Sequence, residues 1–319
     1  MAKGAEMTKG TVLRASGALR HVEHLATLDL EPHIAIPEML RTLNSVVPGA
    51  KTGFFWLNQH GNVVDAYHAD VSDPVPSLSD NGDGVRVHLT ANDRLLAVLA
   101  VHRAAPLVER DRRVFRAAAP SLRRALRNDA RVGERFDASP ERTGVLTATA
   151  DGRLVGADAH ALLLVAEMDG RPLLGKDIAA LHSGERLPSV IAELCHRHTA
   201  RPGSAIILNR TSRWGAYRAQ LFAQHAEQSA ASHHVIVISK HLPHRVGLMR
   251  TIGTLDLSPR ERQVAFQLGI GADASQGAAA LGVSIATWRS YVKRVYLRLD
   301  VSDRFELFSR LNPPTMQPA

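Results

Sequence analysis

The C-terminal part of the chain marks the beginning and end of three short helices in succession. Ser258 can cap a helix that starts at Pro259, and Glu261 stands where its carboxylate can bond back to the capping residue. Gly282 suits the turn after a second helix, and Ser284 can cap a third. The spacing predicts helices over about 259–269, 274–281 and 285–299. This region carries no strand pattern, so an all-helical domain is the prediction that the sequence constrains most.

The third of these predicted helices lacks acidic side chains. Residues 284–299 contain four basic side chains, although the whole chain has 31 acidic residues. One arc of the helix is apolar and should pack against the two preceding helices: Ile285, Trp288, Val292, Val295 and Leu299. The opposite arc carries Arg289, Ser290, Lys293 and Arg294, with Ala286 and Leu297 beside them. A basic helix is most often a solvated surface helix, but the two capped helices before it favour contact with an anionic partner. The net charge of +8 agrees with such a partner without identifying it.

The stretch 257–311 resembles, without a gap, the LuxR-type helix–turn–helix domain of bacterial transcription regulators. The resemblance is carried by the opening Leu257-Ser-Pro-Arg-Glu-Arg262, by Gly271, by Ala278 and the turn Leu281-Gly-Val-Ser284, and by Thr287, Arg289, Val292, Leu299 and Val301. It implies double-stranded DNA as the partner, a homodimer as the active form, and RNA polymerase as a further partner.

The resemblance also implies roles for individual side chains. The third helix of that family enters the major groove, so helix 285–299 would place Arg289, Ser290 and Lys293 against bases or nearby phosphates. Thr287 and Arg294 would contact the DNA backbone, and Ser275 occupies the position of another backbone contact. A fourth helix, about 302–311, would offer Phe305, Leu307 and Phe308 to a second copy of the chain.

The chain departs from the family pattern in the second and third helices. Ser275 stands where the family usually has a phosphate-binding lysine, and Gly277 where it has a buried isoleucine. Ala286 stands where a lysine is frequent, and Trp288 where a small aliphatic residue is usual. The sequence therefore predicts fewer phosphate contacts, and we expect Trp288 to fill the space that Gly277 leaves.

Two α+β patterns precede these helices. In 20–130, strands alternate around turns at His60-Gly61-Asn62 and Ala91-Asn92-Asp93, and an arginine-rich helix follows. In 143–242, a strand, an Asp151-Gly152 turn, a strand and a helix open the pattern, and the segment 205–224 with a buried-type strand at 234–239 closes it. The first pattern resembles a GAF-type domain and the second a PAS-type domain, which implies sensory modules for an unidentified small-molecule ligand.

The predicted fold class is therefore multidomain, with two α+β sensor modules before an all-α four-helix domain. The predicted divisions are a flexible N-terminus (1–19), the GAF-like module (20–130), a linker (131–142), the PAS-like module (143–242), a linker (243–253), the LuxR-type domain (254–312) and a tail (313–319).

Several classes of function lack support in the sequence. It shows no phosphate-binding loop, no Gly-x-Ser-x-Gly elbow and no closed zinc site, so we expect neither an enzyme nor a resident cofactor or metal. Cys195 is the only cysteine and is expected to be buried and inert. No stretch approaches the ~20 apolar residues of a membrane helix, so we expect a cytoplasmic protein without membrane contact.

Two alternatives stay open. The first is a signalling or interaction protein whose degenerate C-terminal helices bind only protein, and the residues Ser275, Gly277 and Ala286 favour it. The second is a haem or redox sensor in which the upstream modules, with the cluster Cys195-His196-Arg197-His198, supply ligands.

Overall fold

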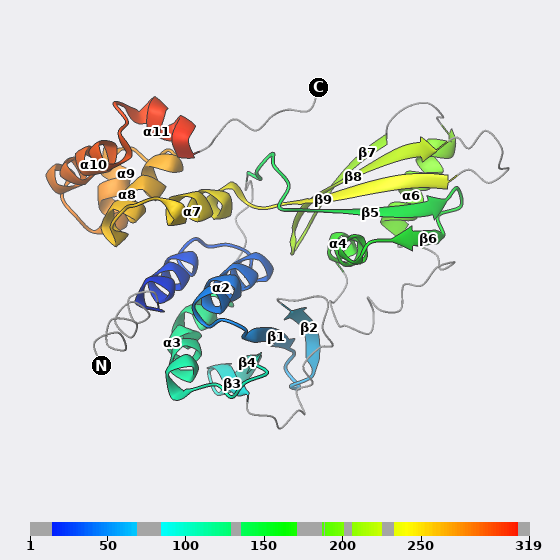
Figure 1. Cartoon of the computed structure of the whole chain (residues 1–319), viewed down its shortest axis with the longest axis horizontal. Coiled ribbons are helices and arrows are strands. Elements are labelled where there is room, and N and C mark those ends of the chain that lie inside the picture. The colour runs from blue at the N-terminus through cyan, green and yellow to red at the C-terminus, as the bar shows by residue number, and fades with distance from the viewer. Residues whose placement is uncertain are drawn as a thin grey trace. The chain divides into compact units, whose positions relative to one another are not determined.

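The computed structural model describes residues 15–68, 84–128, 135–170, 187, 189–200, 206–224 and 233–311. The chain divides into two compact units, one of Met1–Gly133 with Pro140–His241 and one of Glu134–Ser139 with Leu242–Ala319. The first unit holds two antiparallel sheets (Figure 1), which we call the first module (residues 15–128) and the second module (140–241). The second of the two compact units is called the C-terminal unit. The expectations for 1–14 and for the tail 313–319 lie outside the described residues.

The first module is a four-stranded antiparallel sheet in the order β2-β1-β4-β3. Its elements are α2 (Pro32–Val46), β1 (Lys51–Leu57), β2 (Val63–His68), β3 (Val85–Ala91), β4 (Arg94–His102) and α3 (Glu109–Ala125). Both predicted hairpins are confirmed, and Asn92 and Asp93 adopt the positive φ angles, 48° and 57°, that a two-residue hairpin turn favours.

A helix over 15–25 precedes these elements, so the N-terminal segment predicted as flexible to residue 19 is helical from residue 15. The prediction was wrong there because Ala18, Val22 and Leu25 recur at helical spacing and all three are buried.

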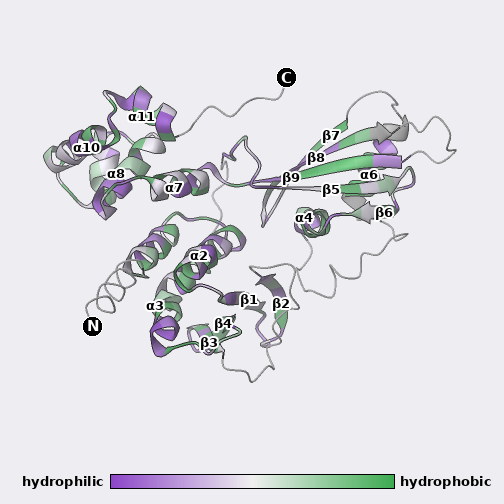
Figure 2. Ribbon diagram, in the orientation of Figure 1, coloured by the Kyte–Doolittle hydropathy of each residue, from purple (hydrophilic) through white to green (hydrophobic). Residues whose placement is uncertain are grey.

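The second module is a five-stranded antiparallel sheet in the order β6-β5-β9-β8-β7. Its elements are β5 (Arg142–Thr149), β6 (Leu154–Ala157), α4 (Ala159–Asp169), α6 (Ser189–Ala200), β7 (Ile206–Ser212), β8 (Gly215–Gln224) and β9 (His233–His241). The middle of β9 is hydrophobic (Figure 2), because residues 235–238 read Val-Ile-Val-Ile. The predicted opening of strand, turn, strand and helix is confirmed.

One aspartate fastens α4 to β5. The carboxylate of Asp158 caps α4 by accepting a hydrogen bond from the Ala161 N–H at 2.7 Å, and it accepts a second from the Val145 N–H at 2.7 Å. The first turn of α4 therefore lies directly on the strand. Gly144 permits this approach, because a Cβ there would lie 2.6 Å from the Cα of Ala161 and closer still to its backbone nitrogen.

Gly144→Ala should therefore destabilise the second module by about 1–3 kcal/mol, since backbone atoms must move to admit one methyl group. Denaturant unfolding followed by circular dichroism measures the change. Gly156→Ala on β6 is the matched control, because a Cβ at that position meets nothing within 4 Å. Equal stability of the two variants would contradict the close approach.

The regular elements described in the C-terminal unit are helices, beside one isolated bridge between Phe136 and Pro243. The unit contains α7 (His244–Thr254), α8 (Pro259–Gly269), α9 (Ala274–Leu281), α10 (Ile285–Leu299) and α11 (Arg304–Leu311). The bounds predicted for α8, α9 and α10 are confirmed. The fourth predicted helix begins at Arg304, two residues later than expected.

Each predicted linker contains regular structure or backbone pairing. Residues 243–253 lie almost entirely in α7, which buries four apolar side chains at helical spacing: Val246, Leu248, Met249 and Ile252. In the segment 131–142, the Asp137 N–H donates to the Leu242 carbonyl at 2.9 Å, and the Glu141 N–H donates to the Lys240 carbonyl at 2.8 Å. Both linker predictions were therefore wrong in part. Apolar residues at helical spacing place most of 243–253 in a helix, and backbone hydrogen bonds hold part of 131–142.

Two histidines of the first module should make its stability depend on pH. The pKa of His24 and of His68 is lowered from 6.5 to about 4, in both cases mainly by burial and for His24 also by the neighbouring His21. Between these pH values the unfolded chain binds more protons than the folded chain, so stability should fall as the pH drops from 6.5 to 4. Denaturant unfolding of the wild type and of a His24→Gln, His68→Gln double variant, above and within this window, measures the effect. The double variant should lose less stability, and equal losses would exclude this cause.

Candidate nucleic-acid interface

Helix α8 starts with the capping box that its sequence predicts. The Ser258 N–H donates to Glu261 Oε2 at 2.8 Å, and the Glu261 N–H donates to Ser258 Oγ at 3.4 Å. The hydrogen bond from Ser258 lowers the pKa of the Glu261 carboxyl, which keeps the acceptor ionised. Arg298 Nε, near the C-terminal end of α10, lies 3.7 Å from Glu261 Oε2, so the same carboxylate also contacts α10.

Helices α9 and α10 are joined by a turn with a cap on each side. Gly282 ends α9 in the left-handed region, with φ 61°. Ser284 then caps α10, and its hydroxyl accepts from the Thr287 N–H at 3.1 Å. Asp273 caps α9 at its other end, accepting from Ser275 and Gln276 at 2.8 Å each. The Asp273 cap was not predicted, although the spacing Asp-x-x-Gln indicates it.

The side chain of Trp288 packs directly onto the backbone of Gly277. A Cβ at Gly277 would lie 2.8 Å from Trp288 Cε2 and closer still to two other ring atoms. Trp288 is only 2% exposed, and Val295 and Leu299 of the same helix are also buried. The expectation that Trp288 fills the space left by Gly277 is therefore confirmed, and this contact fixes which face of α10 turns inward.

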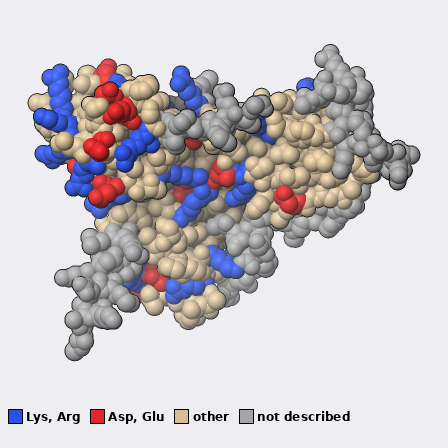
Figure 3. All heavy atoms as spheres, turned by 45° about the horizontal axis from the view of Figure 1, so that its top comes forward, with Lys and Arg blue, Asp and Glu red and all other residues tan. Residues whose placement is uncertain are grey.

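The opposite face of α10 is exposed to solvent. The exposed side chains include all those of α10 predicted to face DNA: Thr287, Arg289, Ser290, Lys293 and Arg294. Arg294 lies over the ring of Tyr291, with 5.2 Å to the ring centroid. Among the residues that the structure describes, neither Arg289 nor Lys293 has a carboxylate partner, whereas Arg298 lies beside Glu261. Lys and Arg side chains line the outer edge of the C-terminal unit in Figure 3.

The apolar arc of α10 is narrower than its sequence predicts. Ile285 is 44% exposed and Val292 is half-buried, so three of the five predicted members, Trp288, Val295 and Leu299, form the buried contact. Ile285 is the first residue of α10, directly after the capping Ser284. Leu297, on the opposite arc, is 74% exposed.

Helix α11 presents two of its three predicted dimer residues. Phe305 is 79% exposed and Phe308 is 47% exposed, whereas Leu307 is 1% exposed. Leu307 and Leu311 turn into the C-terminal unit, four residues apart on one face of the helix. The expectation that Leu307 is available to a partner is therefore corrected, because that side chain contributes to the core.

Ser275 is exposed at the N-terminus of α9, as a backbone-contacting residue must be. Its N–H group is already taken by the carboxylate of Asp273. A phosphate at this helix end would have to approach that carboxylate, so Ser275 is the least favourable member of the predicted set.

The described part of the chain shows neither a cluster of metal ligands nor an exposed cysteine. Within it, no three His, Cys, Asp or Glu side chains lie close enough to hold a metal ion. Cys195 is buried, and burial raises the pKa of its thiol to about 11, which disfavours the reactive thiolate. No helix among the described residues is long and apolar enough to cross a membrane.

Comparisons with known proteins give limited likeness. No protein-family model matches the sequence, and no curated protein matches it. Among solved structures, the chain is similar to the VqmA protein of Vibrio cholerae in complex with a ligand and DNA, with 18% identity, coverage of 53% of this chain and 81% of that chain, and a TM-score of 0.26. It is also similar to a phage VqmA–DPO complex (16% identity, 55% and 82% covered, TM-score 0.23) and to the sensor region of a sensor histidine kinase (14% identity, 69% and 91% covered, TM-score 0.23).

Proposed function

We propose that this chain is a DNA-binding transcriptional regulator of the LuxR type, and not an enzyme. The observation that carries the proposal is the exposed face of α10, where four polar or basic side chains stand together without an acidic neighbour on that helix: Arg289, Ser290, Lys293 and Arg294. The caps at Ser258, Gly282 and Ser284 fix the ends of the three helices, and the buried Trp288 supports this orientation of α10 from its other face.

The four side chains match the chemistry of a DNA groove. The guanidinium of Arg289 and the ammonium of Lys293 suit guanine O6 and N7, and the hydroxyl of Ser290 suits several base edges or a phosphate. Arg294 and Thr287 would hold the DNA backbone and fix the register of α10 in the groove. Because α10 has only 15 residues, one copy contacts few base pairs.

A homodimer on a repeated DNA site follows from that limited contact. The exposed rings of Phe305 and Phe308 on α11 provide an apolar surface for a second copy. Two copies of α10 would then read half-sites about 34 Å apart, one turn of the duplex. The first and second modules would bind a small molecule and control the dimer, and RNA polymerase would be the downstream partner.

Selection of genomic DNA fragments by the purified protein tests the proposal. The regulator should enrich fragments that share one repeated motif, and its affinity for that motif should fall steeply as salt rises, because bound phosphates release counterions. Fragments without a shared motif, or affinity that does not change with salt, would contradict it.

A protein-binding role for the C-terminal unit is the second candidate. Asp273 favours it, since its carboxylate occupies the α9 terminus that would otherwise hold a phosphate. This role predicts no enriched DNA motif in the same selection, so one experiment separates the two candidates.

A further inference from the structure

The first and second modules, which belong to one compact unit, meet through a buried aromatic cluster and an ion pair. Trp214, between β7 and β8, is fully buried, and its ring lies edge-on to His33 and Trp56, with centroids 4.8 Å and 5.7 Å away. Beside it, Arg213 Nη2 lies 2.7 Å from Oδ2 of Asp65, which is 1% exposed. We call these five residues the seam.

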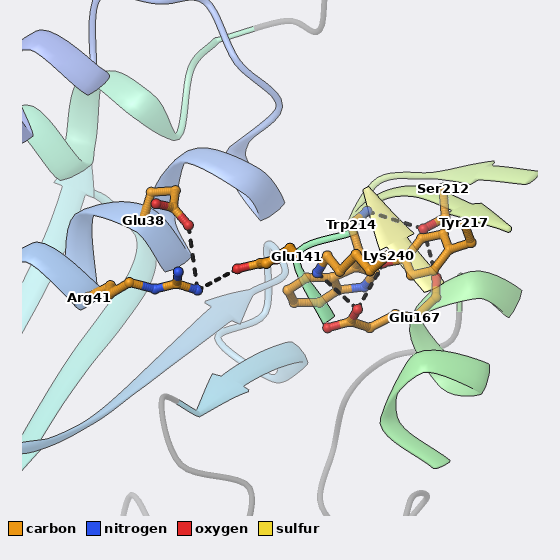
Figure 4. Close-up of polar contacts among 8 residues, drawn as sticks. All are labelled: Glu38, Arg41, Glu141, Glu167, Ser212, Trp214, Tyr217 and Lys240. Carbon is orange, nitrogen blue, oxygen red and sulfur yellow. Dashed lines mark hydrogen bonds and ion pairs between the residues drawn. The ribbon is translucent and has the colours of Figure 1, made fainter. Parts of the chain in front are cut away.

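A second contact joins the two modules a short distance along α2. Arg41 Nη2 lies 2.6 Å from Oε1 of Glu141 and 3.6 Å from Oε1 of Glu38 (Figure 4). The side chains of Glu38 and Glu141 are only 7% and 11% exposed. One guanidinium therefore lies against two carboxylates from different modules and reduces the repulsion between them, and both carboxylates are largely shielded from water.

Glu141 connects this contact to the end of β9. Its N–H donates to the Lys240 carbonyl at 2.8 Å, one residue before β9 ends at His241. The ammonium of Lys240 donates to Glu167 Oε2 at 2.9 Å, and Tyr217 donates to the same oxygen at 2.9 Å (Figure 4). The position of the Glu141 carboxylate is thus tied to the last residues of the central strand.

The seam is also connected to the end of β9. The Ser212 hydroxyl donates to the Glu167 carbonyl at 2.7 Å and accepts from the Trp214 N–H at 3.2 Å. Ala216, which follows the turn, pairs with His241 at the end of β9. Both contacts with the first module therefore converge on one end of the second module's sheet.

That end of the sheet is where the chain continues into the C-terminal unit. One connection runs from His241 to Leu242, and the other from Ser139 to Pro140, next to Glu141. Within the C-terminal unit, the two segments are held together by the Asp137 N–H on the Leu242 carbonyl and by Asp137 Oδ1, 2.9 Å from His244 Nδ1. A shift of Glu141 would therefore act on both chain connections at once.

We infer that the Arg41–Glu141 contact, supported by the seam, is the coupling through which the first module controls the second module's exit into the C-terminal unit. This inference rests on the proposed function, since it assigns to the first module a regulatory effect on the unit that carries α10. Its physical basis is the pair of shielded carboxylates. Without the guanidinium, Glu38 and Glu141 repel one another in a poorly hydrated place, and Glu141 must move toward water.

Hydrogen–deuterium exchange of the full chain, without DNA, tests the coupling. In Arg41→Ala, backbone amides in 135–142 and 238–244 should exchange several-fold faster than in the wild type, because the pairs Glu141–Lys240 and Asp137–Leu242 open more often. Glu141→Gln leaves Arg41 paired with Glu38 but reduces the contact between the modules to a neutral hydrogen bond, so the same amides should exchange faster than in the wild type, though less than in Arg41→Ala. Arg113→Ala on α3 is the matched control. It removes the same charge from the first module, but the partner of Arg113 is Glu109 on the same helix and not a residue of the second module.

A charge swap distinguishes coupling from simple loss of a side chain. The double variant Arg41→Glu with Glu141→Arg should restore slow exchange in both segments. Exchange at the wild-type rate in both segments of both Arg41→Ala and Glu141→Gln would overturn the inference. A charge swap that keeps a native circular dichroism spectrum but does not restore slow exchange would overturn it too. Because no DNA is present, the result stands or falls separately from DNA binding.

Discussion

Trp288→Ala is expected to lower the free energy of unfolding of the C-terminal unit by about 3–5 kcal/mol, the usual cost of deleting a large buried aromatic ring. The ring is 2% exposed and lies on the backbone of Gly277, so α9 cannot close the resulting cavity without shifting as a whole. Denaturant unfolding followed by circular dichroism measures the loss. A loss below about 1 kcal/mol would show that the ring is not part of the core.

The matched experiment uses the glycine under that ring. In the wild type, Gly277→Ala should destabilise by about 1–3 kcal/mol, because overpacking outweighs the gain of ~1 kcal/mol in helix propensity. In a Trp288→Val background the same substitution should become stabilising, since the methyl group then has space. A stabilising effect of Gly277→Ala in the wild type would contradict the contact, and the sign change in the double variant would establish it.

The C-terminal helices could be predicted from the sequence because their signals are local. A cap such as Ser258 with Glu261 is decided within four residues, and a turn glycine such as Gly282 by its own φ angle. Trp288 and Gly277 were linked through two departures from one family pattern, so a single contact explained both. Local chemistry thus determined the bounds of α8, α9 and α10, whereas the contact between Trp288 and Gly277 determined the orientation of the basic face.

Burial depends on neighbours that the sequence does not name, and there the predictions failed. Leu307 and Phe308 are adjacent apolar residues, yet only the packing of α11 decides that Leu307 turns inward. Helix α7 escaped prediction because it has no capping side chain and contains two glycines, Gly247 and Gly253. The pair Asp65–Arg213 joins residues far apart in the chain, and no local pattern marks either as a partner of the other.

The second large effect is expected on DNA binding. Arg289→Ala and Lys293→Ala should each weaken binding to the selected motif about tenfold to a hundredfold, the usual range for loss of one good base contact. Both side chains are exposed, and among the described residues neither has a carboxylate partner, so folding should not change. Fluorescence anisotropy with a labelled duplex measures affinity, and circular dichroism checks the fold.

Comparison with other charge deletions makes this result specific to α10. Arg86→Ala on β3 removes the same charge from an exposed position in the first module and should change affinity little. Arg294→Ala should weaken motif and random DNA alike and reduce the salt dependence, because it would contact a phosphate, whereas Arg289→Ala should weaken the motif more than random DNA. If Arg289→Ala, Lys293→Ala and Arg86→Ala had equal effects, binding would reflect net charge alone, and α10 would not be the helix that reads the groove.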